Sequence, residues 1–383
     1  MSPTLSHLEK LIAFPTVSRD SNLALIDYLR THLESLGFQC WLAPSEDRRK
    51  ANLHASLGPA GVPGVLLSGH TDVVPCEGQA WSSEPFALRR ADGKLYGRGT
   101  ADMKGFIASC LALAEKAKGR RLTVPLQFAF SYDEEVGCLG VRRLIDMMQD
   151  LAPRPRFCIV GEPTLMQIVT AHKGKRALRV EATGLEAHSS LAPLGVNAIH
   201  LALDLVSEIR KLQDEIAARG LRDGDYDVPY TTLHVGRFAG GETLNIVPNH
   251  AVLDFEIRHL PGDDAAAMIA RLEQKAKEIA SAAREKFAGA CLAFTPLTGY
   301  PALDTPPDAE VVSFMKSLNG ANATGKISFG TEGGLFQERL GIPAVVCGPG
   351  SIAVAHKPDE YVEETQLAAC DRLLEKLLDR LAG

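Results

Sequence analysis

The sequence has no long hydrophobic segment and few aromatic residues. No apolar run approaches the roughly 20 residues that a membrane-spanning helix needs. The start, MSPTLSHLEKLIAF, lacks the basic end and the long apolar core of a signal peptide, and it predicts a first helix instead. Aromatic residues make up 6%, without the basic–aromatic interleaving of RNA-binding proteins, and the net charge is −6. We therefore expect no membrane and no nucleic acid as partner.

Several familiar catalytic motifs and a disulfide framework are also missing. The sequence contains no HExxH zinc-protease helix and no GxSxG nucleophile elbow, and GRGTADMKG lacks the final Lys-Ser/Thr of a phosphate-binding loop. The eight cysteines include no CxxC pair. Scattered cysteines are typical of buried thiols in a reducing compartment, so we expect a cytoplasmic protein.

The composition and periodicity of the chain predict an α/β protein. The 383 residues suffice for two or three domains, and 45% hydrophobic with 23% charged residues is typical of a globular enzyme. Apolar segments alternate with helical patterns, which predicts a mostly parallel mixed sheet with helices on both faces. The expected strands are 38–43, 51–57, 64–69, 124–131 and 156–161, and the expected helices are 103–118 and 137–151, after two helices within 1–37.

The pattern changes near residue 174, where GKRALRVEATG alternates like a strand with one exposed face. The order β-α-β-β-α-β follows, with helices near 196–218 and 263–286, and it predicts a ferredoxin-like α+β domain. The chain then returns to α/β, with helices at 308–318, 333–340 and 363–381 and a strand at 344–348. We expect one domain formed by 1–174 and 299–383, with a smaller domain, 175–298, inserted into it; the loop 220–229 receives no role.

Side chains suited to metal binding stand at the ends of short apolar segments. Because strand ends of an α/β sheet face a common crevice, we expect them to lie together. Two histidines with several carboxylates suit one or two Zn²⁺-like ions, so the sequence predicts a hydrolase that uses a metal-activated water. These residues are His70, Asp72, Asp102, Glu134, Glu135, Glu162 and His356.

Each of these residues also has a structural alternative. Asp72, two residues after His70, could hold the far nitrogen of a metal-bound imidazole, or it could cap a helix beside a structural histidine. Asp102, in a glycine-rich turn, could bridge two ions, cap the helix that begins near Met103, or do both.

The pair Glu134–Glu135 ends an apolar strand together with Asp133. Neighbouring side chains in extended chain point apart, so one glutamate could bind a metal while the other serves as general base. The alternative is a solvated acidic loop, although like charges at the end of a buried strand repel unless cations neutralise them. Glu162 and His356 could each be structural alone. Together, the set favours a two-metal site.

The ordered motifs resemble the M20 metallopeptidase family over nearly the whole chain. SGHTDVVP at 68–75, GRGTADMKG at 97–105, DEE at 133–135 and GEPT at 161–164 look like its signatures. The closing stretch GPGSIAVAHKPDEYV is similar to the acetylornithine deacetylase branch. The resemblance implies a catalytic metal-binding domain in two parts, and an inserted domain that acts as a lid and mediates homodimerisation.

The resemblance also implies residue roles. His70 and Glu162 would bind one metal, Glu135 and His356 the other, and Asp102 would bridge them and precede a cis peptide to Met103. Glu134 would be the general base and acid, and Asp72 would orient His70. His188 in EAHSS would reach the partner subunit's site and stabilise the oxyanion. Asn245 in TLNIVP and Arg258 in FEIRH would bind the substrate and its carboxylate. The cofactors would be two divalent ions per subunit, Zn²⁺ or Co²⁺.

These roles imply removal of the acetyl group from N2-acetyl-L-ornithine, a step of arginine biosynthesis that gives L-ornithine and acetate. Glu332 in SFGTEGGLF stands where a basic substrate side chain could be met. Three alternatives stay open. They are a succinyl-diaminopimelate desuccinylase, whose more negative substrate calls for more cationic pocket residues; a deacylase of another N-acyl amino acid such as acetylcitrulline; and a metal-dependent binding protein without turnover. The presence of Glu134 argues against the last, because binding alone needs no base.

Overall fold

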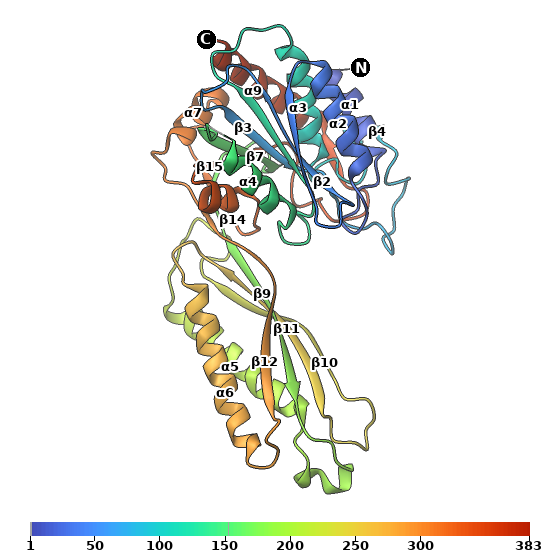
Figure 1. The fold of residues 1–383 in the computed structure, drawn as a ribbon, viewed down its shortest axis with the longest axis vertical. Coiled ribbons are helices and arrows are strands. Elements are labelled where there is room, and N and C mark those ends of the chain that lie inside the picture. Colours follow the sequence, from blue (N-terminus) through green and yellow to red (C-terminus); the bar gives the residue numbers. More distant parts are fainter. Residues whose placement is uncertain (1, 152) are drawn as a thin grey trace. The chain divides into compact units, whose positions relative to one another are not determined.

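The apolar segments of the sequence form the centre of a mixed β-sheet in the computed structural model, which describes residues 2–151 and 153–383 (Figure 1). Four neighbouring strands are parallel to one another, and all of their residues are buried. Strands covered on both faces need mostly apolar side chains, which explains why these segments are rich in hydrophobic residues. In spatial order they are β6 (Leu126–Ser131), β3 (Val65–His70), β7 (Phe157–Pro163) and β15 (Ala344–Gly348).

Shorter strands extend the sheet at both edges. Beyond β6 lie β2 (Ala51–Leu57) and β1 (Gln39–Pro44), paired antiparallel. Beyond β15 lie β8 (Val169–His172) and β13 (Leu303–Asp304), and β14 (Gly325–Ile327) pairs with β8. The four central strands and β1 and β2 agree with the expected segments, whereas β8, β13 and β14 were not expected because such short segments carry no periodicity.

Helices cover both faces of this sheet. One apolar core joins the sheet to α1 (Pro3–Ile12), α2 (Leu23–Ser35), α3 (Lys104–Ala117), α7 (Glu310–Asn319) and α9 (Glu364–Ala382). The helix α4 (Gly140–Asp150) packs on β1, β2 and β6, and α8 (Gly333–Leu335) continues into a π-helical turn, η2 (Phe336–Leu340). The helix α4 starts three residues later than expected because Gly137 and Cys138 have positive φ and form a turn.

A small three-stranded sheet joins two distant parts of the chain. It consists of β4 (Arg89–Ala91), β5 (Lys94–Tyr96) and β16 (Tyr361–Glu363). Tyr361 pairs with Tyr96 and Glu363 with Lys94. This pairing brings the loop after β5 beside the segment that precedes β16.

The contacts within the chain divide it into two units. The first contains the sheet described above and comprises the chain up to Ala171 together with Leu303–Lys326 and Thr331–Gly383. The second comprises His172–Ala302 and Ile327–Gly330. None of the helices in the described residues is both long and apolar enough to span a membrane.

The second unit is a ferredoxin-like α+β domain, as the sequence predicts. Its antiparallel strands follow the order β10–β11–β9–β12, and the chain order is β-α-β-β-α-β. Asn197 and Asp264 cap the two long helices by accepting hydrogen bonds from first-turn amides. The elements are β9 (Gly174–Thr183), a 3₁₀ turn η1 (Ser189–Leu194), α5 (Ala198–Arg219), β10 (Thr232–Gly240), β11 (His250–His259), α6 (Ala265–Arg284) and β12 (Cys291–Tyr300).

Candidate metal centre

Asp102 lies between two histidines at the carboxyl ends of the central strands. Its Oδ1 is 2.9 Å from Nε2 of His70, the last residue of β3, and its Oδ2 is 3.2 Å from Nε2 of His356. His356 stands in the loop after β15 with a positive φ of 61°. The peptide bond from Asp102 to Met103 is cis, which confirms what the family resemblance implies. The two oxygens of one carboxylate thus face two different imidazoles.

Each histidine has a second carboxylate partner. Oε1 of Glu162, in β7, is 3.6 Å from Nε2 of His70. Oε2 of Glu135 is 3.0 Å from Nε2 of His356. The ligand atoms therefore fall into two sets that share Asp102, and each set contains one imidazole and two carboxylates.

The chemistry of this cluster suits divalent cations. Burial raises the pKa of Glu135 to about 7, and burial together with neighbouring carboxylates raises the pKa of Glu134 and of Glu162 well above the ordinary value. Oε1 of Glu135 is buried and has no hydrogen-bond partner among the described residues. Buried carboxylates that repel one another are stabilised by cations, and imidazole with carboxylate is a donor set for Zn²⁺-like ions. The residues present therefore fit such ions.

Asp72 holds the Glu134–Glu135 turn rather than the ring of His70. The carbonyl oxygen of Asp72, not its carboxylate, lies 2.8 Å from Nδ1 of His70, whereas Oδ1 is 3.6 Å away. The carboxylate accepts hydrogen bonds from the amides of Glu134 and Glu135, at 3.1 and 3.3 Å, and from Ser18 Oγ at 2.7 Å. The expected carboxylate–imidazole contact assumed strand geometry, but β3 ends at His70, so the alternation does not extend to Asp72.

Glu134 lies beside the metal-suited residues without a hydrogen bond to either histidine among the described contacts. One of its carboxylate oxygens is within 4.8 Å of ligand atoms of His70 and Glu162. The strand β6 ends at Ser131 and Asp133 has a φ of 56°, so Glu134 and Glu135 stand in a turn and not in extended chain. The turn, and not strand alternation, therefore determines where the two side chains lie.

Glu360 and Arg98 support the turn that carries Asp102, and neither was among the expected site residues. Oε1 of Glu360 accepts hydrogen bonds from the amides of Gly99, Ala101 and Asp102, at 3.1, 2.9 and 3.1 Å. Its Oε2 accepts from Nη1 of Arg98 at 2.6 Å, and both side chains are at most 1% exposed. Their location in GRGTAD and HKPDEY was the available signal, since both stretches already held candidate ligands.

Glu332 is buried and hydrogen-bonded to two serines of the sheet, which does not suit the expected contact with a substrate side chain. It is 1% exposed and accepts hydrogen bonds from Ser131 Oγ at 2.5 Å and Ser68 Oγ at 3.2 Å. Burial raises its pKa to about 7. Because Ser68 and Ser131 belong to β3 and β6, we interpret Glu332 as a support between those strands rather than a specificity residue.

The other three expected site residues belong to the second unit. His188 is exposed, and its Nδ1 accepts a hydrogen bond from the amide of Ser190 at 3.2 Å, which leaves Nε2 as the protonated nitrogen of the neutral ring. The carbonyl of Asn245 accepts from the amide of Ser189 at 2.9 Å, so Asn245 stands close to His188 in the fold. Arg258 donates to Glu256 at 3.0 Å and to Tyr300 Oη at 2.6 Å.

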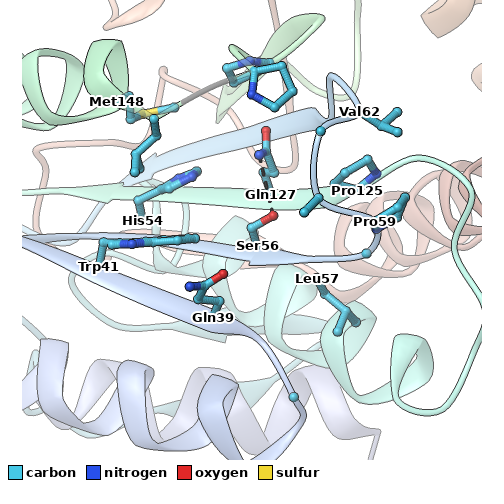
Figure 2. Close-up of a pocket in the computed structure, with 17 residues that line it drawn as sticks. Gln39, Trp41, His54, Ser56, Leu57, Pro59, Val62, Pro125, Gln127 and Met148 are labelled. Atoms are coloured by element: carbon cyan, nitrogen blue, oxygen red, sulfur yellow. Dashed lines mark hydrogen bonds between the residues drawn. The ribbon is translucent and has the colours of Figure 1, made fainter.

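A cavity of about 330 Å³ lies elsewhere on the first unit and contains none of the metal-suited residues (Figure 2). It is lined by side chains of β1, β2 and β6, including Trp41, His54 and Gln127, and the rings of Trp41 and His54 stack at 5.3 Å. His54 Nδ1 is 3.0 Å from the carbonyl of Phe128. The described residues that line this cavity include no carboxylate, so we do not place hydrolysis there.

Comparison with known proteins assigns the chain to a class of enzyme. The family model described as "Peptidase family M20/M25/M40" matches residues 66–380. The chain is 34% identical to the acetylornithine deacetylase of Proteus mirabilis, over 98% of this chain and 96% of that protein. It is 36% identical to the acetylornithine deacetylase of Klebsiella pneumoniae, over 95% of this chain and 94% of that protein.

Solved structures share the fold. The M20 family metallo-carboxypeptidase Sso-CP2 from Sulfolobus solfataricus superimposes with a TM-score of 0.80 at 21% identity, over 100% of this chain and 99% of that one. Aminopeptidase PepT from Bacillus cereus gives 0.77 at 20% identity, over 100% and 98%. Fold and sequence together define a hydrolase that acts on amide bonds. The chain belongs to peptidase family M20/M25/M40.

Proposed function

We propose that this protein removes the acetyl group from N2-acetyl-L-ornithine and releases L-ornithine and acetate, as a cytoplasmic step of arginine biosynthesis. The observation that carries the proposal is Asp102, whose two carboxylate oxygens face His70 and His356. This arrangement suits two ions held in common by one carboxylate. The choice of acetylornithine rests on the names of relatives at 34–36% identity over nearly the whole chain.

Five side chains would hold two divalent ions, Zn²⁺ or Co²⁺. His70 and Glu162 would bind one, His356 and Glu135 the other, and Asp102 both. When bound, such ions supply Lewis acidity and lower the pKa of water toward neutrality.

Glu134 would move the proton of the reaction. The carboxylate would take a proton from the attacking water and return it to the departing amine, so one residue serves as base and then as acid. Burial and the neighbouring carboxylates Glu135 and Glu332 raise the pKa of Glu134, which moves it toward the neutral range where such a group works well. The amide of Glu134 is fixed by Asp72 at 3.1 Å, so the base is positioned by its own backbone.

The second unit would supply the remaining groups. The Nε2–H of His188 would donate to the oxyanion of the tetrahedral intermediate, while Asn245 and Arg258 would bind the substrate and its α-carboxylate. We propose that His188 acts in the site of a second copy of this chain, within a homodimer formed through the second unit. Its apolar side chains Leu244, Leu194 and Leu191 are 101%, 67% and 52% exposed, and β10 is an edge strand. Exposed apolar groups beside a free strand edge are typical of an association surface.

Steady-state turnover on a panel of N-acyl amino acids tests the proposal most directly. We expect metal-loaded protein to hydrolyse acetylornithine with a higher kcat/KM than acetylcitrulline, acetylmethionine or succinyl-diaminopimelate. Chelation should abolish activity and Zn²⁺ or Co²⁺ should restore it. A preference for acetylcitrulline or for the succinyl substrate would replace the ornithine assignment with the corresponding alternative. Full activity without metal would overturn the metal site itself.

A further inference from the structure

A second cluster of metal-suited side chains lies on the first unit and shares no residue with the proposed active site. It comprises His7 of α1, His32 in the last turn of α2 and Glu115 near the end of α3. Nε2 of His7 is 2.9 Å from Oε1 of Glu115, and Nε2 of His32 is 3.6 Å from the same oxygen. All three atoms lie within 4.8 Å of one another.

The spacing of these atoms agrees with one tetrahedral ion. Zn²⁺ ligands at about 2.0–2.1 Å in tetrahedral geometry lie about 3.3 Å apart. The two measured separations, 2.9 and 3.6 Å, fall on either side of this value. A simple ion pair between α1 and α3 would account for His7 and Glu115, but it gives no reason for the ring of His32 to lie beside them.

The Nε2 atom of His32 is available to bind a metal ion, because it makes no hydrogen bond among the described residues. It is buried, and it points to the Glu115 carboxylate. Burial, His7 and Lys10 lower the pKa of His32 against the opposing effect of Glu115. A neutral imidazole is the form that binds metals. An ion would give the unpaired nitrogen a partner.

Tyr28 provides the support that metal-bound histidines usually have. Its hydroxyl is 3.3 Å from Nδ1 of His7, the ring nitrogen that does not face Glu115. A hydrogen bond at the far nitrogen fixes the tautomer and makes the near nitrogen a better ligand. The side chains of His32 and Glu115 are 22% and 38% exposed, so an ion can enter from solvent.

We propose that His7, His32 and Glu115 bind one divalent transition-metal ion of the Zn²⁺ type, with solvent as the fourth ligand. The ion ties together the helices α1, α2 and α3, each of which contributes one ligand. Its role is to stabilise the fold, and it is independent of the proposed reaction.

The number of tightly bound Zn²⁺ ions separates this site from the active site. Wild-type protein, His32→Gln, Glu115→Gln and the matched control His200→Gln, which alters an exposed histidine of α5, are equilibrated with Zn²⁺ and freed of excess metal. We expect His32→Gln and Glu115→Gln to hold one ion fewer per chain than wild type and the control. Turnover of the metal-loaded enzyme should be unchanged in both variants. Equal metal content in wild type and His32→Gln would overturn the proposal.

Two further measurements distinguish a bound ion from a structural contact. Zn²⁺ should raise the Tm of wild type by more than it raises that of His32→Gln, because the variant keeps only the active-site ions. Tyr28→Phe retains all three ligands, and it should weaken Zn²⁺ binding at this site by about tenfold or more, as loss of a supporting hydrogen bond does. An identical Zn²⁺-dependent rise in Tm for wild type and His32→Gln would also contradict the site.

Discussion

Glu360 accepts a hydrogen bond from the backbone amide of Asp102, although the two residues stand 258 positions apart in the sequence. The same oxygen binds two further amides of the turn, and the other oxygen binds Arg98. The shape of the turn that presents Asp102 to both histidines thus depends on a residue four positions after one of them, His356.

We predict that Glu360→Gln lowers both stability and metal affinity. The amide could still accept from the turn, but the buried guanidinium of Arg98 would lose its charged partner. Removing one member of a buried ion pair typically costs about 3–5 kcal/mol, and losing support for a ligand weakens metal binding by roughly 10–100-fold. Urea unfolding and metal titration measure the two effects. The exposed neighbour Glu363→Gln is the control, and equal behaviour of both variants would exclude the role given to Glu360.

Glu134 and Glu135 should differ in what their loss removes. Glu134→Gln should retain both ions and the fold while turnover falls by roughly 10²–10⁴-fold, the usual contribution of general acid–base catalysis. Glu135→Gln should lose metal, because Glu135 lies 3.0 Å from His356 within one ligand set. Metal analysis together with kcat distinguishes the two. Loss of metal in Glu134→Gln with retention in Glu135→Gln would reverse the assignments.

Mixed dimers test whether His188 acts across a subunit interface. His188→Ala and Glu134→Gln chains should each be inactive as homodimers. A heterodimer contains one site with an intact Glu134 and with His188 from the other chain, so activity should partly return after subunit exchange. If labelled chains exchange and turnover stays absent, His188 does not act in trans.

Glu332→Gln should change kcat/KM for acetylornithine and acetylmethionine by the same factor, because Glu332 is buried and hydrogen-bonded to two serines. Glu332→Ala should be less stable than Glu332→Gln by about 2–6 kcal/mol, since two buried hydroxyls lose their acceptor at about 1–3 kcal/mol each. Kinetics on both substrates and urea unfolding provide the data. A selective loss for acetylornithine would instead restore Glu332 as a substrate contact.

His54 should make the protein acid-sensitive between about pH 6.5 and pH 4. Burial lowers the pKa of His54 to about 4, whereas the pKa of a histidine in the unfolded chain is about 6.5. In this window the unfolded chain binds a proton that the folded chain does not, so the free energy of unfolding falls as the pH falls, by about 3 kcal/mol in all. Urea unfolding of metal-free protein measures how much more stable wild type is than His54→Gln. This difference should shrink by that amount as the pH falls through the window. A difference that is constant with pH would contradict this.

Local sequence patterns suffice to predict the central strands and the residues at their ends. Short apolar runs such as 128–130 and 157–160 are typical of strands that are buried on both faces. A mostly parallel sheet with His70 and Glu162 at its strand ends can therefore be predicted from the local pattern. The strands of the second unit could also be predicted from the sequence, because their residues alternate between a buried and an exposed face.

Contacts between distant parts of the chain depend instead on tertiary packing. The end of β3 at His70 directs the Asp72 carboxylate to the amides of Glu134 and Glu135, and the pairing of β16 with β5 brings Glu360 to Asp102. Glu332 is buried, so we interpret it as a support within the sheet and not as a substrate contact. Three helices bring His7, His32 and Glu115 close together. Such contacts depend on how distant segments pack. Hydrophobic periodicity cannot predict them, because it indicates only which face of an element is buried.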